Sequence, residues 1–427
     1  MVYIGGCFFM KRILSLLLCS IFLVACSSSS NSNVLSAPSS APTQSNSHTD
    51  SEAPLESSEG GMLRFSSGLS LHGNKSGTYF VQMNEQGEYQ IYFADYPSKQ
   101  IVALCSKPNC AHDGEECTSW VQCRANKPYI IPLEDKLVYL YPGNPAYFDI
   151  YGEATLPFIE VRSLTGEFLK KVIEFGSGIK LSGEYAVDKD AIYLLEENVS
   201  TSDLNITRSL IKVSLSDGKK SVIVSFEPEA GENYFWVGTN DNQFIFKKIK
   251  ADPALLQVGG QKMISSQTHE LFTVDKSGNI SASFQKWQQD TGAQFGVDNA
   301  LFFIENRTLS SIVPDTQITV EHGALEPSYV SFSAYVEPFV ILNSSVYRSA
   351  SFDAPIYYAA NMETGEFKEL SLIADLGQDS QFIFWSNSGS ELFGMYFDDS
   401  GQQQFASISI DDLWSNVPNW VLFEKNF

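Results

Sequence analysis

Short runs of aromatic, aliphatic and β-branched residues fill most of the chain after residue 61. Clear examples lie at 79–81, 89–93, 136–140, 191–195 and 243–246, and Gly, Asp or Asn residues separate such runs. Runs of this length and composition predict β-strands. Few segments show the 3.6-residue period of an amphipathic helix. The pattern therefore predicts an all-β domain.

A polar turn, usually with glycine, recurs about every 50 residues. The turns fall at 97–99, 164–167, 216–219, 276–279, 314–316 and 363–366, with a looser one near Asp411 and Asp412. Repeats of this length, each with about four strands, are typical of β-propeller blades. The seven turns therefore predict a β-propeller of seven four-stranded blades. Six or eight blades, or tandem β-sandwiches, are the alternatives.

Closing a ring of blades requires the two ends of the domain to meet. Residues 63–71 and 420–423 have the composition of strands and lie at these two ends. We therefore expect them to be the closing strands.

The N-terminal segment has the pattern of an export signal. Lys11 and Arg12 precede a mostly apolar run over 13–25, a length that suits such a signal and is short for a membrane span. The run ends at Ala25 and Cys26, and four serines follow. An uncleaved signal anchor is the alternative, and Met10 is an alternative start.

The sequence Leu-Val-Ala-Cys at 23–26 resembles the lipobox of bacterial lipoproteins. The resemblance implies a signal peptide over 1–25, cleavage before Cys26 and attachment of a lipid to its thiol. The chain is then anchored to the extracytoplasmic face of the cell membrane through Cys26. Residues 26–61, rich in serine and interrupted by prolines, predict a flexible tether, and 62–427 form the propeller domain.

The charge balance argues against some partners. The chain carries 28 basic and 50 acidic residues, for a net charge of −22. Nucleic acid and anionic lipid surfaces are poor partners for such a chain, so we expect no nucleic-acid binding. The acidic surface is better explained by solubility.

The cysteines form the one local sequence pattern that suggests metal binding, disulfides or redox chemistry. Within the propeller domain all four lie in the Cys-rich loop at 105–123. Cys105, Cys110, His112 and Cys117 have the spacing C-x4-C-x-H-x4-C, which can wrap a structural zinc ion. Alternatively, Cys105, Cys110, Cys117 and Cys123 form two disulfides, as is common outside the cytoplasm. A redox dithiol is a third alternative, although it more often has C-x-x-C spacing.

This loop is similar to one in a group of exported, uncharacterised lipoproteins from anaerobic, mainly Gram-positive bacteria. The shared pattern is LCxKPxCxHxxxxC, which here comprises Leu104, Cys105, Lys107, Pro108, Cys110, His112 and Cys117. Those proteins combine a lipobox, a serine-rich tether and a propeller-like domain. The resemblance implies a fold and a location and leaves the activity open.

Sequence patterns of common enzymes are absent from the chain. It has no G-x-S-x-G, H-E-x-x-H or P-loop sequence, and His72, His269 and His322 are isolated. We therefore expect a surface-anchored, non-enzymatic binding module for an extracellular peptide, glycan or protein. The alternatives are a carboxylate-dependent glycan hydrolase or lyase and a scaffold in an envelope assembly.

Overall fold

The computed structural model describes much of the chain between Arg64 and Asn426. The described residues are 64–66, 73–83, 87–199, 206–240, 243–256, 259–288, 294–297, 300–305, 308–314, 316–324, 331–336, 338–344, 347–348, 351–352, 356–370, 376, 383–387, 389–398 and 400–426. The predicted signal peptide, the predicted lipidation site Cys26 and the predicted tether lie outside them.

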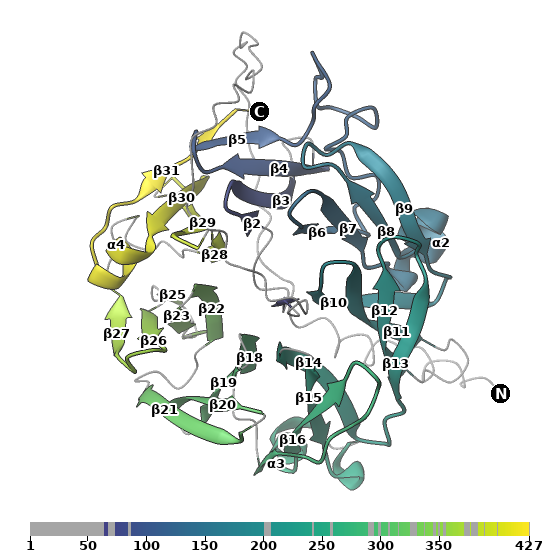
Figure 1. Ribbon diagram of the computed structural model, residues 1–427, viewed down its shortest axis with the longest axis vertical. Coiled ribbons are helices and arrows are strands. Elements are labelled where there is room, and N and C mark those ends of the chain that lie inside the picture. The colour runs from purple at the N-terminus through teal and green to yellow at the C-terminus, as the bar shows by residue number, and fades with distance from the viewer. Residues whose placement is uncertain are drawn as a thin grey trace, which may run out of the picture. The chain divides into compact units, whose positions relative to one another are not determined.

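Seven sheets stand around a ring in chain order, and each sheet is one blade (Figure 1). Blade 1 contains β2 (Gly73–Asn74), β3 (Gly77–Met83), β4 (Tyr89–Asp95) and β5 (Gln100–Ala103); blade 2 contains β6 (Tyr129–Pro132), β7 (Leu137–Tyr141), β8 (Phe158–Arg162) and β9 (Phe168–Glu174); blade 3 contains β10 (Ile179–Val187), β11 (Ala191–Val199), β12 (Ile206–Ser214) and β13 (Lys220–Phe226). Among these four strands the first lies nearest the centre of the ring and the fourth nearest its outside, and the short strands β1 (Arg64–Ser66) and β32 (Glu424–Lys425) extend the sheets of blades 3 and 1.

The other four blades repeat this arrangement. Blade 4 contains β14 (Glu232–Asn240), β15 (Gln243–Lys250), β16 (Thr268–Asp275) and β17 (Gln285–Gln288); blade 5 contains β18 (Gln294–Val297), β19 (Ala300–Glu305), β20 (Thr308–Val313) and β21 (Ile318–Ala324); blade 6 contains β22 (Ser331–Val336), β23 (Phe339–Ser344), β26 (Ile356–Asn361) and β27 (Phe367–Leu370); blade 7 contains β28 (Ile383–Asn387), β29 (Glu391–Phe397), β30 (Gln403–Ser409) and β31 (Val421–Leu422). A hairpin of β24 (Tyr347–Arg348) and β25 (Ser351–Phe352) is inserted in blade 6. The prediction of a seven-bladed propeller is confirmed.

Short helices occupy some of the connections. In blade 2, β7 and β8 are joined by η1 (Pro145–Tyr147), α2 (Phe148–Tyr151) and η2 (Gly152–Thr155); in blade 4, β15 and β16 are joined by η3 (Pro253–Leu255) and α3 (Gly260–Ser265). The looser turn expected near Asp411 and Asp412 does lie between the last two strands of blade 7, but this connection contains the helix α4 (Ile410–Ser415) rather than a hairpin turn. Ser409 caps α4 by accepting a hydrogen bond from the Asp412 backbone N–H, and Leu413 is buried.

The predicted closing strands were wrong in their detail. β1 (Arg64–Ser66) pairs antiparallel with β10 at the inner edge of blade 3, and Val421–Leu422 is the outer strand of blade 7. The ring closes instead through β32 (Glu424–Lys425), which pairs in parallel with β5 of blade 1. Phe423 fixes this junction because its ring is buried between Phe393 of blade 7 and Tyr96 of blade 1.

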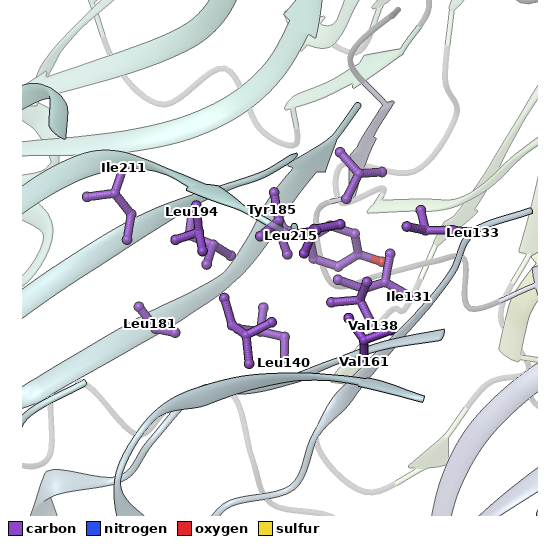
Figure 2. Close-up of a cluster of buried hydrophobic side chains, with 14 of the residues drawn as sticks. Ile131, Leu133, Val138, Leu140, Val161, Leu181, Tyr185, Leu194, Ile211 and Leu215 are labelled. Carbon is purple, nitrogen blue, oxygen red and sulfur yellow. The ribbon is translucent and has the colours of Figure 1, made fainter. Parts of the chain in front are cut away.

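Apolar side chains fill the spaces between neighbouring blades. Figure 2 shows Val138, Leu140 and other side chains of blade 2 facing Leu181, Leu194 and other side chains of blade 3. Burial of each such side chain stabilises the fold by roughly 1.5–3 kcal/mol. Because one sheet cannot bury both of its faces alone, each blade depends on its two neighbours.

Candidate metal centre

The Cys-rich loop is an excursion from the outer strand of blade 1. β5 pairs with the last part of β4, and the chain then leaves the sheet at Cys105. It returns beside the first part of β4, where the Ile91 N–H donates to the Ser119 carbonyl and the Val121 N–H donates to the Tyr89 carbonyl. The two ends of the excursion therefore lie next to each other. The loop therefore lies between the last strand of blade 1 and the first strand of blade 2.

Four potential metal ligands meet at the base of this excursion. The sulfur atoms of Cys105, Cys110 and Cys117 and a ring nitrogen of His112 all lie within 4.8 Å of one another. His112 Nδ1 is 3.3 Å from Cys117 Sγ. Cys117 is buried and the other three are partly exposed. The spacing that predicted a metal site in the sequence thus gathers the same four residues in space.

Two residues with left-handed backbone bring the ligands together. Asn109 has a φ angle of 54° and His112 one of 57°, so the chain turns sharply twice around Cys110. The carbonyl of His112 accepts a hydrogen bond from the side-chain amide of Gln90 in β4. This contact ties the segment around His112 to the sheet.

The local environment gives the ligands different proton affinities. Burial would raise the pKa of Cys105, but hydrogen bonds from Thr118 and from the Lys107 backbone outweigh it and lower the pKa to about 7. Burial raises the pKa of Cys117 to about 11, although the Ser119 hydroxyl, 2.9 Å from the sulfur, opposes this rise. Burial also lowers the pKa of His112, which favours the neutral ring that binds metals.

Three thiols and an imidazole suit a soft divalent metal. Cys3His sets are typical of zinc, and four protein ligands complete its tetrahedral shell without a position for water or substrate. A metal held here would supply folding free energy, and its binding would release the proton that Cys117 retains. The cluster can therefore bind a metal, and its geometry fits a structural centre.

Cys123 lies apart from this group. Its side chain is buried, and its carbonyl accepts a hydrogen bond from the Asn126 N–H. In the structure Cys105, Cys110, Cys117 and Cys123 are all free thiols. The disulfide alternative pairs all four, whereas the structure places only three beside His112.

Blade 2 supports the excursion through residues that the sequence pattern did not single out. Arg162 Nη1 donates to the carbonyls of Thr118 and Gly166, at 2.9 and 3.2 Å, and its Nε donates to Glu160 at 2.6 Å. Ser106 donates to Glu167 at 3.0 Å. Arg162 and Glu167 lie at the turn of the strand–turn repeat, so the repeat was visible in the sequence but its contact with the loop was not.

The other histidines of the described residues stay away from the centre. His269 is buried in β16, and His322 is hydrogen bonded to Ser311 at 2.8 Å. His72 lies outside the described residues. In the part of the chain that the structure describes, no helix has the length and apolar character needed to span a bilayer.

Comparisons with known proteins agree only on the fold. A scan against protein-family models and a search of curated proteins gave no match. The chain is similar to a post-proline cleaving enzyme from Rickettsia typhi, with 11% identity, a TM-score of 0.50 and coverage of 83% of this chain and 52% of that one. This chain thus spans about half the length of that enzyme.

Two other solved structures are similar at lower scores. An oligogalacturonate lyase from Vibrio parahaemolyticus has 14% identity and a TM-score of 0.46, with coverage of 82% of this chain and 85% of that one. The β-propeller domain of the Trilobed protease from Pyrococcus furiosus has 10% identity and a TM-score of 0.44, with coverage of 80% and 93%. Sequence identities this low indicate a similar fold and nothing about activity.

Proposed function

We propose that this chain is a lipid-anchored propeller on the extracytoplasmic face of the membrane and that a structural zinc ion stabilises its Cys-rich loop. The propeller binds a peptide, glycan or protein without transforming it. The observation that carries the proposal is the Cys3His group, whose ligand atoms lie within 4.8 Å of one another. Because four protein ligands fill the shell of the ion, the metal supports shape rather than catalysis.

The position of the centre supports a binding role. The ion would join the two ends of the excursion, at Cys105 and Cys117, and the excursion contacts blade 2 through Arg162 and Glu167. A loop fixed in this way is held rigidly on the outside of the ring. Rigid scaffolds that carry fixed loops are a common basis for recognition.

Metal analysis tests the zinc centre. We expect one zinc ion for each purified mature chain, loss of that zinc in Cys117→Ser, and retention of it in the control Cys123→Ser. Removal of zinc by a chelator should lower the thermal midpoint of the wild type and leave that of Cys117→Ser unchanged. A wild-type chain without metal and without reactive thiols after denaturation would instead support disulfides.

Two further measurements test the anchor and the binding role. Cys26→Ser should move the protein from the membrane fraction to the medium, and mass spectrometry of the wild-type N-terminal peptide should show a lipid on Cys26. Arrays of glycans and peptides should give ligands that are recovered unchanged. Cleavage of a glycan by the purified domain would contradict the non-enzymatic role.

A further inference from the structure

The connection between β7 and β8 in blade 2 is a closed and rigidly held insertion over 142–157. The buried side chain of Asn126 accepts a hydrogen bond from the Gly143 N–H at 2.8 Å and donates to the Ala154 and Leu156 carbonyls at 3.2 and 2.8 Å. Asn144 adds backbone and side-chain hydrogen bonds to Thr155 and Ala125. One buried amide therefore binds both ends of the insertion. Figure 1 shows its helix α2 at the outer side of the ring.

This insertion exposes three large apolar side chains within one turn of its helical part. Tyr147, Ile150 and Tyr151 are 45%, 69% and 49% exposed, and their spacing places them on one side. The rings of Tyr147 and Tyr151 have centroids 6.1 Å apart. Ordered, exposed tyrosines beside an aliphatic side chain are typical of the centre of a protein interface.

The charged side chains of the insertion itself are all acidic. Asp149 and Glu153 are exposed on the insertion, and 142–157 contains no Lys or Arg. Neither acid forms an ion pair with the described residues. At the foot of the insertion, Lys171 is already paired with Glu174 at 2.6 Å. A partner that brings cations would gain both ion pairs and cation–π contacts with the two tyrosine rings.

We infer that Tyr147, Ile150 and Tyr151, flanked by Asp149 and Glu153, form a docking face for a peptide segment that carries Arg or Lys next to apolar side chains. The inference rests on the proposed binding function and names the class of its ligand. The apolar side chains of the peptide would cover Ile150, and its cations would lie over the tyrosine rings and beside the acids. An anionic lipid surface is disfavoured by the same two acids.

Fluorescence anisotropy with the mature full-length chain tests this inference. The probe is a labelled twelve-residue peptide that repeats the unit Arg-Arg-Leu-Leu, and the same peptide with Glu in place of Arg is the comparison. We expect the Arg peptide alone to bind, with affinity reduced at least tenfold in Tyr147→Ala/Tyr151→Ala and about threefold to tenfold in Asp149→Asn/Glu153→Gln.

The matched control is Phe168→Ala/Leu169→Ala, which removes two exposed apolar side chains from β9 at the far end of blade 2. It should leave the affinity unchanged. Because the acid variant alters two charges of a chain with a net charge of −22, nonspecific attraction would change little in it. A loss of affinity in the acid variant would therefore come from the loss of contacts with Asp149 and Glu153.

Several outcomes would overturn the inference. They are equal binding of the Arg peptide by the tyrosine variant, no binding of either peptide, and tyrosine-dependent binding of chito-oligosaccharides or phosphatidylglycerol vesicles in place of the peptide. Peptide binding that survives in the tyrosine variant would agree with the proposed binding function but would show that the peptide binds elsewhere on the chain. Turnover of a glycan would contradict the proposed function itself.

Discussion

At the residue scale, the grouping of the three cysteines with His112 was predictable because these residues are close in sequence. Cys105, Cys110, His112 and Cys117 span one short loop, so their spacing already limits how far apart they can lie. The supporting residues were not predictable in this way. Gln90 and Arg162 come from strands of two different blades, and only the folded ring brings them to the loop.

A second cluster of charges sits at the start of blade 4 and gives a pH-dependent prediction. Burial would raise the pKa of Glu232, but hydrogen bonds from Lys248 and Lys250, both at 2.8 Å, outweigh it and lower the pKa to about 2. A carboxylate whose pKa is lower in the folded state stabilises the protein above its unfolded pKa of about 4.3. This stabilisation disappears as the pH falls towards 2.

We therefore expect Glu232→Gln to lower the free energy of unfolding by about 1–2 kcal/mol at pH 7, because Lys248 and Lys250 are partly exposed and water screens the pairs. The difference from the wild type should shrink between pH 4.5 and 2 in urea unfolding. Glu229→Gln is the control, because Glu229 is 77% exposed in the same cluster. A difference that is constant over this pH range would show that the ion pairs are not its source.

At the scale of the element, the recurring turn does more than reverse the chain. Gly166, Gly218 and Gly278 have positive φ angles of 87°, 72° and 89°. A Cβ atom on each would collide with a carbonyl of the preceding blade, those of Leu104, Val172 and Ile223. The glycines permit the turn and also the close approach of neighbouring blades. The sequence predicted the first role from composition, whereas the second depends on the spacing of blades.

This double role predicts unequal costs for the same substitution. Gly218→Ala should destabilise the domain by about 3 kcal/mol, because it adds both left-handed strain and a clash with Val172. Gly401→Ala should cost about 1 kcal/mol, because Gly401 has a φ of 75° but open space around its Cα. Thermal or urea unfolding of both variants measures the difference. Equal losses would mean that blade contact adds nothing at this turn.

At the scale of the whole molecule, the number of blades was predictable and the closure was not. The period of the turns counts blades directly, since each unit repeats the same local pattern. Closure depends instead on which strand edge the terminal residues meet. Both termini contain strand-like sequence, yet β1 joins blade 3 and β32 joins blade 1.

The closure gives a prediction for the stability of the ring. Phe423→Ala should destabilise the domain by about 3–5 kcal/mol, because it leaves a cavity between blades 7 and 1. Phe397→Ala is the control, since Phe397 is 48% exposed in β29. Unfolding in urea measures both effects. A loss for Phe423→Ala no larger than that for Phe397→Ala would show that closure does not depend on this ring.

The pairing of β1 with β10 also determines how the ring would carry a mechanical load. The next strand in the chain, β2, belongs to blade 1, so the first two strands join two blades that are not neighbours in the ring. Tension on the N-terminal end would reach the inner edge of blade 3 first and would pass to blade 1 only after β1 had detached. Because β1 is only three residues long, its hydrogen bonds to β10 would break under a smaller load than the longer strands of the blades could carry.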